Sequence, residues 1–424
     1  MSVLRANRNF RRLWVAGLIS DIGDWMLLVA LPVLVYQVTG STMGTALAFL
    51  VELIPVLLVT PIAGRLADRR NRRTVLVTVS LVQAVLLLPL LGGAHLAILY
   101  GVIATQAGMA VVFDTAKNAV LPTLVAPEEL VAANSLIGLN QNLGRLVGAA
   151  LGGLALVDGG VWTIVVGDAS SFLLAAALIW GTRVAAAPVP SESQVPRHGD
   201  ATAGSPFSRR PVRAGLAVVG LTAIAQGLFI VLFVVFVART LHGTAAENGV
   251  LRGVQAIGAI GGGLLLARTR NVRPGRLTGS ACLVFGAIAL TVWNIPHLTT
   301  WEPVYVALFI AVGVPSIGMT SGLMSALQMA TVDGERGRVF AAVGAVFSAG
   351  QAVGMLTAGL LGDHVGIAWL LDAQGLLLVL SGVAALLWLN GDHRQIRPEF
   401  RGVGSADGRD DDAGHVGVVA GKEL

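Results

Sequence analysis

The chain has 424 residues, of which 55% are hydrophobic and 12% charged, with a mean hydropathy of +0.77. These values are typical of membrane proteins and exclude a soluble globular protein. A net charge of +5 could suggest a nucleic-acid-binding protein. The arginines, however, gather in short segments between apolar runs, which is the pattern that orients a membrane protein. The single cysteine, Cys282, excludes an intrachain disulfide and a cysteine-based metal site.

Twelve apolar segments of about twenty residues or more recur along the chain, each long enough to cross the hydrocarbon core of a bilayer. Inside lipid a helix satisfies every backbone polar group, so we predict an all-α membrane protein with 12 transmembrane helices in two six-helix halves. The first segment is too long for the core of a signal peptide and remains helix one. In chain order the predicted helices are 11–38, 43–65, 73–93, 95–120, 131–157, 161–182, 212–238, 246–268, 275–294, 302–329, 336–361 and 365–390.

The longest internal break, residues 183–211, is rich in Pro, Ser and Gly and follows the sixth segment. It predicts a flexible cytoplasmic linker between an N-terminal half, 1–182, and a C-terminal half, 212–390. The last residues, 391–424, contain Asp410–Asp412 and several glycines but few apolar side chains. We therefore expect a disordered cytoplasmic tail.

Arginine is unevenly distributed between the loops on the two sides of the predicted membrane. One side carries Arg5, Arg8 and the 183–211 break, whereas on the other side only Arg239 and Arg252 come near a loop. Positive charge marks cytoplasmic loops, so we predict that both termini lie on the cytoplasmic side of the cell (cytoplasmic) membrane. An even number of crossings agrees with that placement.

The turn between the second and third segments is the most distinctive stretch, because Gly64–Arg73 reads G-R-L-A-D-R-R-N-R-R. This order resembles the loop between helices two and three of the major facilitator superfamily, usually written G-x-L-A-D-R-x-G-R-K. Here Asn71 replaces the second glycine and Arg73 the terminal lysine. Asparagine tolerates left-handed backbone almost as glycine does, so we expect the tight turn to persist.

The resemblance covers residues 10–390 and implies a secondary transporter whose two halves rock about a central site. It also implies that Asp68 faces the start of the eleventh helix, where the macrodipole favours a carboxylate. Arg72 would pair with a carboxylate of the fourth helix, here best matched by Asp114, which can also pair with Lys117 one turn away. The conformational-gate residues implied in this way are Gly64, Asp68, Arg69, Arg72 and Asp114.

The two halves contain matching short sequence motifs. A G-x-x-V-G motif with a further glycine five residues on, at 144–153, recurs at 350–359 with an offset of 206. Asp168-Ala169 recurs as Asp372-Ala373 with an offset of 204. Two matched helix pairs at nearly one offset indicate a duplicated six-helix unit, and the matched places favour a structural role for both aspartates.

The fifth segment has small residues four apart, a spacing that lets helices approach closely. It resembles the motif G-x-x-x-G-P-x-x-G-G, which the superfamily associates with proton-coupled exporters, although Ala149 stands in place of the proline. Helix packing alone is the alternative interpretation. The antiporter-like residues are Gly144, Gly148, Gly152 and Gly153. Several short sequence motifs resemble those of the drug and siderophore efflux branch of the superfamily: Asn9-Phe10-Arg11, Ala30-Leu31-Pro32, Ala133-Asn134-Ser135-Leu136 and residues 334–340.

Ionisable side chains lie well inside the predicted helices. Each costs on the order of a few kcal/mol in lipid on insertion scales, and so indicates either a partner or a function. We predict a polar site along the central cavity, where protonation switches the ion pairing of these groups and thereby couples transport to protons. A permanent Asp–Arg pair that only holds helices together is the alternative. The predicted site residues are Asp21, Asp24, Glu52 and Arg145.

These observations predict a secondary active transporter, and our main hypothesis is a proton-coupled exporter of an amphipathic small molecule such as a drug, an antibiotic or a siderophore-like compound. The alternatives are a facilitator or importer on the same fold and a non-transporting membrane sensor or assembly protein. Residues 258–263 are glycine-rich but follow no strand, and there is no nucleotide-binding lysine motif, so we expect no enzyme activity, cofactor or metal. The expected partners are the substrate, protons and the lipid bilayer, with no nucleic acid, and a monomer suffices for function.

Overall fold

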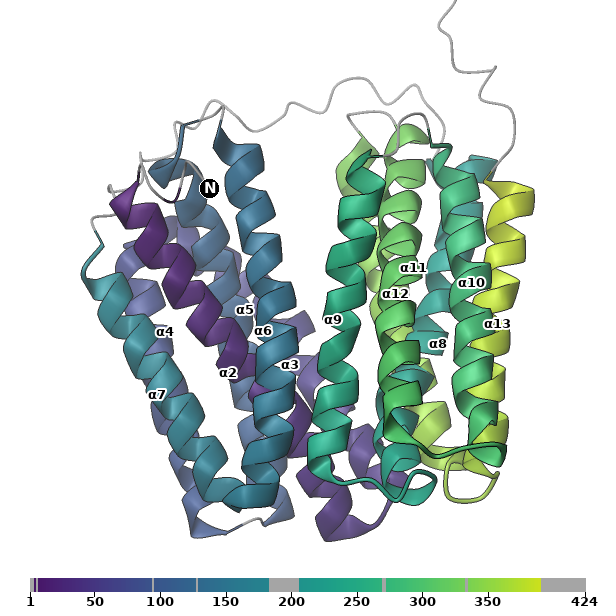
Figure 1. Ribbon diagram of the computed structural model, residues 1–424. Coiled ribbons are helices and arrows are strands. Elements are labelled where there is room, and N and C mark those ends of the chain that lie inside the picture. The colour runs from purple at the N-terminus through teal and green to yellow at the C-terminus, as the bar shows by residue number, and fades with distance from the viewer. Residues whose placement is uncertain are drawn as a thin grey trace, which may run out of the picture. The chain divides into compact units, whose positions relative to one another are not determined.

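The twelve predicted segments are helices in the structure (Figure 1). The computed structural model describes Leu4 and residues 7–93, 95–126, 129–182, 206–268, 272–331 and 335–389. The predicted tail, 391–424, lies outside the described residues, as does the predicted linker up to residue 205. The division into halves, linker and tail remains a prediction, although α8 begins at Arg210, just before the predicted end of the linker.

Two groups of six long helices make up the described residues, in which no strand occurs. The predicted fold class is confirmed. Eleven of the helices are long and apolar enough to cross a membrane, and the remaining one is α6. The N-terminal half comprises α2 (Arg8–Thr39), α3 (Thr42–Arg69), α4 (Arg72–Leu86), α5 (Leu96–Leu124), α6 (Leu130–Asp158) and α7 (Gly160–Trp180). The C-terminal half comprises α8 (Arg210–Arg239), α9 (Ala245–Arg268), α10 (Pro274–Asn294), α11 (Glu302–Met329), α12 (Arg336–Leu361) and α13 (Ile367–Trp388).

Local chemistry explains where several helices begin and end. Gly40 adopts a left-handed conformation, with φ of 61°, and ends α2, while Ser41 caps the start of α3. The predicted third segment, 73–93, is divided, because Pro89 cannot donate the helical hydrogen bond and a short 3-10 turn replaces the α-helix from Leu88 to Gly92.

The tight turn persists between Arg69 and Arg72, but Asn71 does not adopt the left-handed conformation from which we predicted it. Asn71 has φ of −61° and ψ of 112°, and its side chain accepts hydrogen bonds from the amides of Arg73 and Thr74. Asparagine is therefore suited to this turn as the N-cap of α4, a role that satisfies amides which the first helical turn leaves without partners.

Repeated glycines pack equivalent pairs of helices in the two halves: α2 with α6, and α8 with α12. A Cβ at Gly148 of α6 would overlap the carbonyl oxygen of Ile22 in α2, and a Cβ at Gly354 of α12 would overlap that of Ile224 in α8. The next repeated glycine of each motif faces the other half of the protein, since Gly153 packs on Ala245 of α9 and Gly359 on Ala46 of α3. These paired contacts are what a duplicated unit related by a two-fold axis produces.

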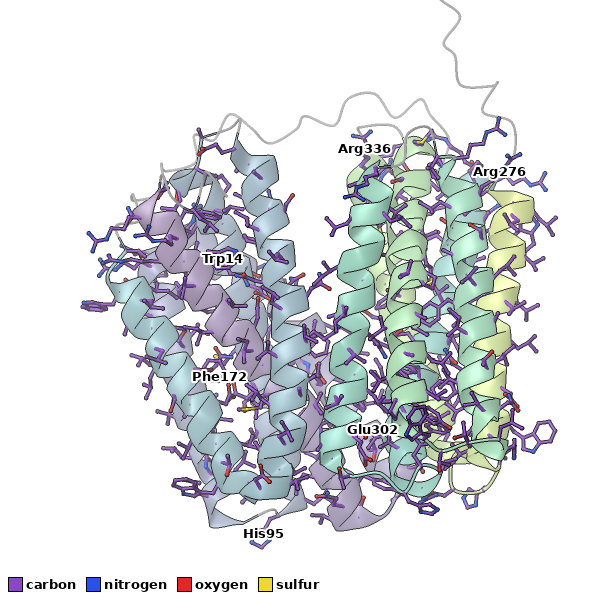
Figure 2. All side chains as sticks on the ribbon, in the orientation of Figure 1. Trp14, His95, Phe172, Arg276, Glu302 and Arg336 are labelled. Atoms are coloured by element: carbon purple, nitrogen blue, oxygen red, sulfur yellow. The ribbon has the colours of Figure 1, made fainter. Side chains whose placement is uncertain are left out.

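The helices give the protein two ends. Arg276 and Arg336 lie at one end in Figure 2, which we call the arginine-rich end and which also holds the turn between α3 and α4. His95 and Glu302 lie at the other end, which we call the opposite end and which also holds the turn between α2 and α3.

Candidate functional site

A cavity of about 360 Å³ opens among α2, α3, α5 and α6 of the N-terminal half. Apolar side chains, including Trp25, Leu28 and Leu31, form much of its wall. Among the described residues, no group of His, Cys, Asp or Glu side chains is arranged to hold a metal ion. The polar side chains that line the cavity are Asp21, Asp24, Glu52, Gln106, Asp114 and Gln141.

The predicted glycine motif of α6 packs against the part of α2 that lines this cavity. Gly144 packs on Asp21, and Gly148 packs on the Ile22 carbonyl and the Trp25 side chain. Because a Cβ at either glycine would overlap α2, a larger residue would push the helices apart. The motif therefore fixes the cavity wall through close packing, and Ala149 is fully buried where the resembling motif has proline.

Asp21 forms an ion pair with Lys117, which we had predicted to pair only with Asp114 on its own helix. The Lys117 ammonium lies 2.7 Å from Asp114, the predicted partner one turn away, and 3.7 Å from Asp21 on α2. The Lys117 side chain is 5% exposed and that of Asp21 is 13% exposed, whereas Asp114 is more than half exposed. One buried cation thus serves two carboxylates on different helices, and it links α2 to α5.

A second buried carboxylate lies beside Gly23, the residue that precedes Asp24. The Asp168 side chain, from α7, lies against Gly23 and accepts a hydrogen bond of 3.1 Å from Ser171. Asp168 is fully buried, and its Oδ2 has no hydrogen-bond partner among the described residues. Asp24 lines the cavity and has no ion pair with any described residue. Both acids thus lie inside the N-terminal half without an ion-pair partner among the described residues.

Arg145, predicted as the counter-charge of the aspartates, lies over the Trp25 ring, with its guanidinium carbon 5.9 Å from the ring centroid. Its Nε is buried without a hydrogen-bond partner among the described residues. Arg252, which the sequence placed near a loop, lies in the second turn of α9 and is only 7% exposed inside the protein. Its guanidinium lies 5.7 Å from the centroid of Phe49 on α3, one helical turn from Glu52. Sequence hydropathy could not reveal this position, which depends on how α9 faces the other half.

The gate motif is only partly described. Arg72 donates a hydrogen bond of 2.7 Å to the carbonyl oxygen of Ala119 on α5, so it reaches the helix that the resemblance implied. A side chain at Gly64 would meet no neighbour within 4 Å. The side chains of Asp68 and Arg69 lie outside the described residues, and the expected contact of Asp68 with α12 therefore remains a prediction.

A cluster at the opposite end joins the two halves. The Arg239 guanidinium lies 2.9 Å from Asp363, and it donates hydrogen bonds to the Tyr36 hydroxyl at 2.6 Å and to the Gly40 carbonyl at 2.9 Å. The Thr42 amide and hydroxyl donate to Asp363 at 3.0 and 2.8 Å. We call these five residues, Tyr36, Gly40, Thr42, Arg239 and Asp363, the latch. No sequence motif marked them.

The latch keeps Asp363 ionised. Partial burial alone would raise the pKa of this carboxyl, but hydrogen bonds from Thr42 and the adjacent Arg239 guanidinium outweigh it and hold the pKa below its ordinary value. The carboxylate thus remains available to bind both halves over the physiological pH range.

Comparison with known proteins agrees with this fold. A family model described as "Transmembrane secretion effector" matches residues 2–394. The chain is 29% identical to the multidrug efflux pump Tap of Mycolicibacterium fortuitum, over 88% of this chain and 93% of that protein. It is 27% identical to the enterobactin exporter EntS of Salmonella typhimurium, over 94% and 96% of the two chains. A bacterial homologue of the iron transporter ferroportin, at 17% identity in its inward-facing state, superimposes with a TM-score of 0.71 over 90% of this chain and 99% of that one. The outward-facing structure of a ferroportin homologue gives 0.58.

Proposed function

The chain belongs to the transmembrane secretion effector family of major facilitator transporters, and it is related to efflux pumps and siderophore exporters. We propose that it is a proton-coupled exporter of an amphipathic small molecule. The observation that carries the proposal is the cavity whose mainly apolar wall contains Asp21, Asp24 and Glu52. An apolar wall with few polar groups suits an amphipathic substrate, and carboxylates withdrawn from water can bind and release protons.

Protons and substrate would use this cavity in turn. When Asp24 and Asp21 are ionised, Lys117 offers the nearest positive charge, and protonation of the carboxylates would release that attraction between α2 and α5. The buried Asp168 beside Gly23 offers a second acceptor for the same proton. Exchange of protons against substrate at one cavity is how alternating access couples two opposed fluxes.

The latch would close the pathway at the opposite end. Arg239 and Asp363, from the C-terminal half, bind Tyr36, Gly40 and Thr42 of the N-terminal half. With the arginine-rich end in the cytoplasm, as positive charge favours, the cavity would load from the cytoplasm, and a single chain would carry the whole pathway through the cell membrane.

Uncoupled facilitation is the second candidate, because one observation favours it. Lys117 already neutralises part of the acidic cluster by pairing with Asp21 and Asp114. If this pairing were permanent, the carboxylates would hold helices together and bind no transported proton.

Inside-out vesicles that contain the protein and a pH-sensitive dye distinguish the two candidates. With the lumen energised to acid pH, hydrophobic cations, macrolides and siderophore-like compounds are added in turn. Wild type should alkalinise the lumen with at least one compound, and Asp24→Asn and Glu52→Gln should lose that response while still binding the compound. The control is Glu302→Gln, which neutralises an exposed carboxylate at the opposite end (Figure 2). Solute counterflow without proton movement, equal in all variants, would establish the facilitator instead.

A further inference from the structure

Two arginines from different halves approach each other beside the cavity. Gly253 of α9 packs on the carbonyl oxygens of Arg145 and Leu146 in α6, so Arg252, its neighbour in the chain, lies next to Arg145. α6 and α9 also run side by side (Figure 1).

Neither arginine has a full set of partners. Each guanidinium lies against an aromatic ring, Arg145 against Trp25 and Arg252 against Phe49. Among the described residues, neither forms an ion pair within 4.0 Å, and the Nε of Arg145 is buried without a hydrogen-bond partner. Guanidinium groups present planar sets of donors that match carboxylate, sulfonate or phosphate oxygens, and stacking on a ring leaves those edge donors free.

One carboxylate lies near this pair. Glu52, which lines the cavity, is one helical turn from Phe49, the ring that Arg252 covers, and it forms no ion pair within 4.0 Å with either arginine among the described residues. When all three groups are ionised, two positive charges share one negative charge in a largely buried place. Like charges held together away from water are costly, so a second anion beside the two arginines would be strongly favoured.

We propose that Arg145 and Arg252 form a subsite that binds an acidic group of the transported molecule, with Glu52 as the resident anion that this group competes against. The rest of the substrate then lies along Trp25, Leu28 and Leu31 in the cavity. Because one arginine comes from each half, the acidic group binds both halves at once, and its departure leaves them free to separate. The inference rests on the proposed export function, since it names the chemistry of the exported compound.

Two fluorescent probes that differ only by one sulfonate test the subsite: anilinonaphthalene sulfonate, which is anionic, and the parent N-phenylnaphthylamine, which is neutral. Binding to the full chain is measured in phosphatidylcholine nanodiscs, with empty nanodiscs subtracted. Wild type should prefer the sulfonate. Arg145→Gln and Arg252→Gln should each weaken sulfonate binding roughly tenfold or more, as loss of a charge-assisted hydrogen bond does, and should leave the neutral probe unchanged. Glu52→Gln should strengthen sulfonate binding.

Matched variants separate loss of charge from loss of folding. Arg145→Lys and Arg252→Lys keep the charge but lose the planar set of donors, so each should bind the sulfonate more weakly than wild type and more tightly than the matching Gln variant. Arg276→Gln removes an exposed arginine and should change nothing. Equal binding of the two probes by wild type, absence of sulfonate binding, or an unchanged sulfonate affinity in both Gln variants would overturn the proposal. Loss of sulfonate binding when phosphatidylglycerol replaces phosphatidylcholine would assign the arginines to a lipid headgroup and also overturn it.

The outcome is independent of the export test. If the arginines select the sulfonate but no compound moves protons, the subsite stands and proton-coupled export fails. If neutral compounds move protons and the Gln variants are unaffected, export stands and the acidic subsite fails.

Discussion

The two halves of the protein are packed alike and charged differently. Gly144 and Gly350 occupy the same place in the repeat, and they pack on Asp21 and Ala223, respectively. If α8 is aligned with α2 so that Ala223 corresponds to Asp21, then Gln226 corresponds to Asp24. The duplicated scaffold therefore retains its glycines in both halves, whereas the carboxylates that line the cavity belong to one half.

The C-terminal half has an aromatic cluster instead of the charges. Phe233 of α8 stacks on Phe229 at 5.3 Å between centroids, and it meets Phe309 at 5.2 Å. Phe236 packs edge-on against Trp293 at 5.0 Å. The comparison shows that the glycine packing is common to both halves, whereas the carboxylates to which we assign proton coupling line a cavity in one half only.

Lys117→Met should have the largest effect and should distinguish the halves most sharply. Removal of this cation leaves Asp21 buried without a counter-charge, at a cost of about 3 kcal/mol or more. In the repeat, Lys117 of α5 corresponds to the apolar Leu323 of α11. Leu323→Met exchanges one apolar side chain for another and should cost under about 1.5 kcal/mol. Thermal unfolding in detergent measures both, and Lys117→Met combined with Asp21→Asn should recover stability. Equal losses for the two single variants would contradict the charge difference.

Gly148→Val and Gly354→Val should damage both halves alike. Each new side chain overlaps a backbone carbonyl on the facing helix, and overpacking of this kind costs about 1–3 kcal/mol or more. Yield of folded protein and melting temperature provide the measurement. Gly138→Ala and Gly344→Ala are the controls, because a Cβ at either position meets nothing within 4 Å. A large loss in one half with none in the other would show that the glycine contacts are not equivalent.

Phe233→Leu should weaken the C-terminal half without changing proton coupling. The ring is fully buried between Phe229 and Phe309, so its loss should cost about 1–2 kcal/mol through reduced packing. The pH dependence of transport should match that of wild type after correction for the amount of folded protein. A shift of the pH profile would place part of the coupling in the aromatic cluster.

Asp363→Asn should have the smallest effect on stability, because both members of the Arg239–Asp363 pair are about one-third exposed, and exposed pairs contribute about 0–1 kcal/mol. The folded pKa of Asp363 is lowered, so its contribution is present above the ordinary pKa of the carboxyl and is lost as pH falls through the folded value. Wild type should therefore open more readily at the opposite end in strong acid. Labelling of Ala46→Cys by a membrane-impermeant reagent measures opening, in a background where the buried Cys282 is replaced by Ala.

In Asp363→Asn the labelling should already be fast at neutral pH and should show little further rise in acid. Thr299→Ala, in a loop at the same end, is the matched control. Slow labelling in Asp363→Asn, equal to wild type, would contradict the role of the latch.

The sequence predicted the helices well because each needs only a long apolar run, and the boundaries of α11 and α12 agree with the predicted 302–329 and 336–361. It also singled out Asp21, Asp24 and Glu52, whose charge is unexpected within an apolar run; all three line the cavity, and their role in transport stays a prediction. The contact of Lys117 with Asp21 and the burial of Arg252 could not be predicted. Both depend on how one helix is rotated against a distant one, and helical periodicity in single segments carries no information on that rotation.

The most direct test of the account is substrate accumulation in proteoliposomes under an imposed pH gradient, with a compound identified in the vesicle assay. Wild type and Gln226→Leu should accumulate the compound against its concentration gradient. Asp24→Asn should only equilibrate it, because without the carboxylate the proton gradient no longer drives transport. Accumulation by Asp24→Asn equal to wild type, or its loss in Gln226→Leu alone, would contradict the assignment of proton coupling to the N-terminal half.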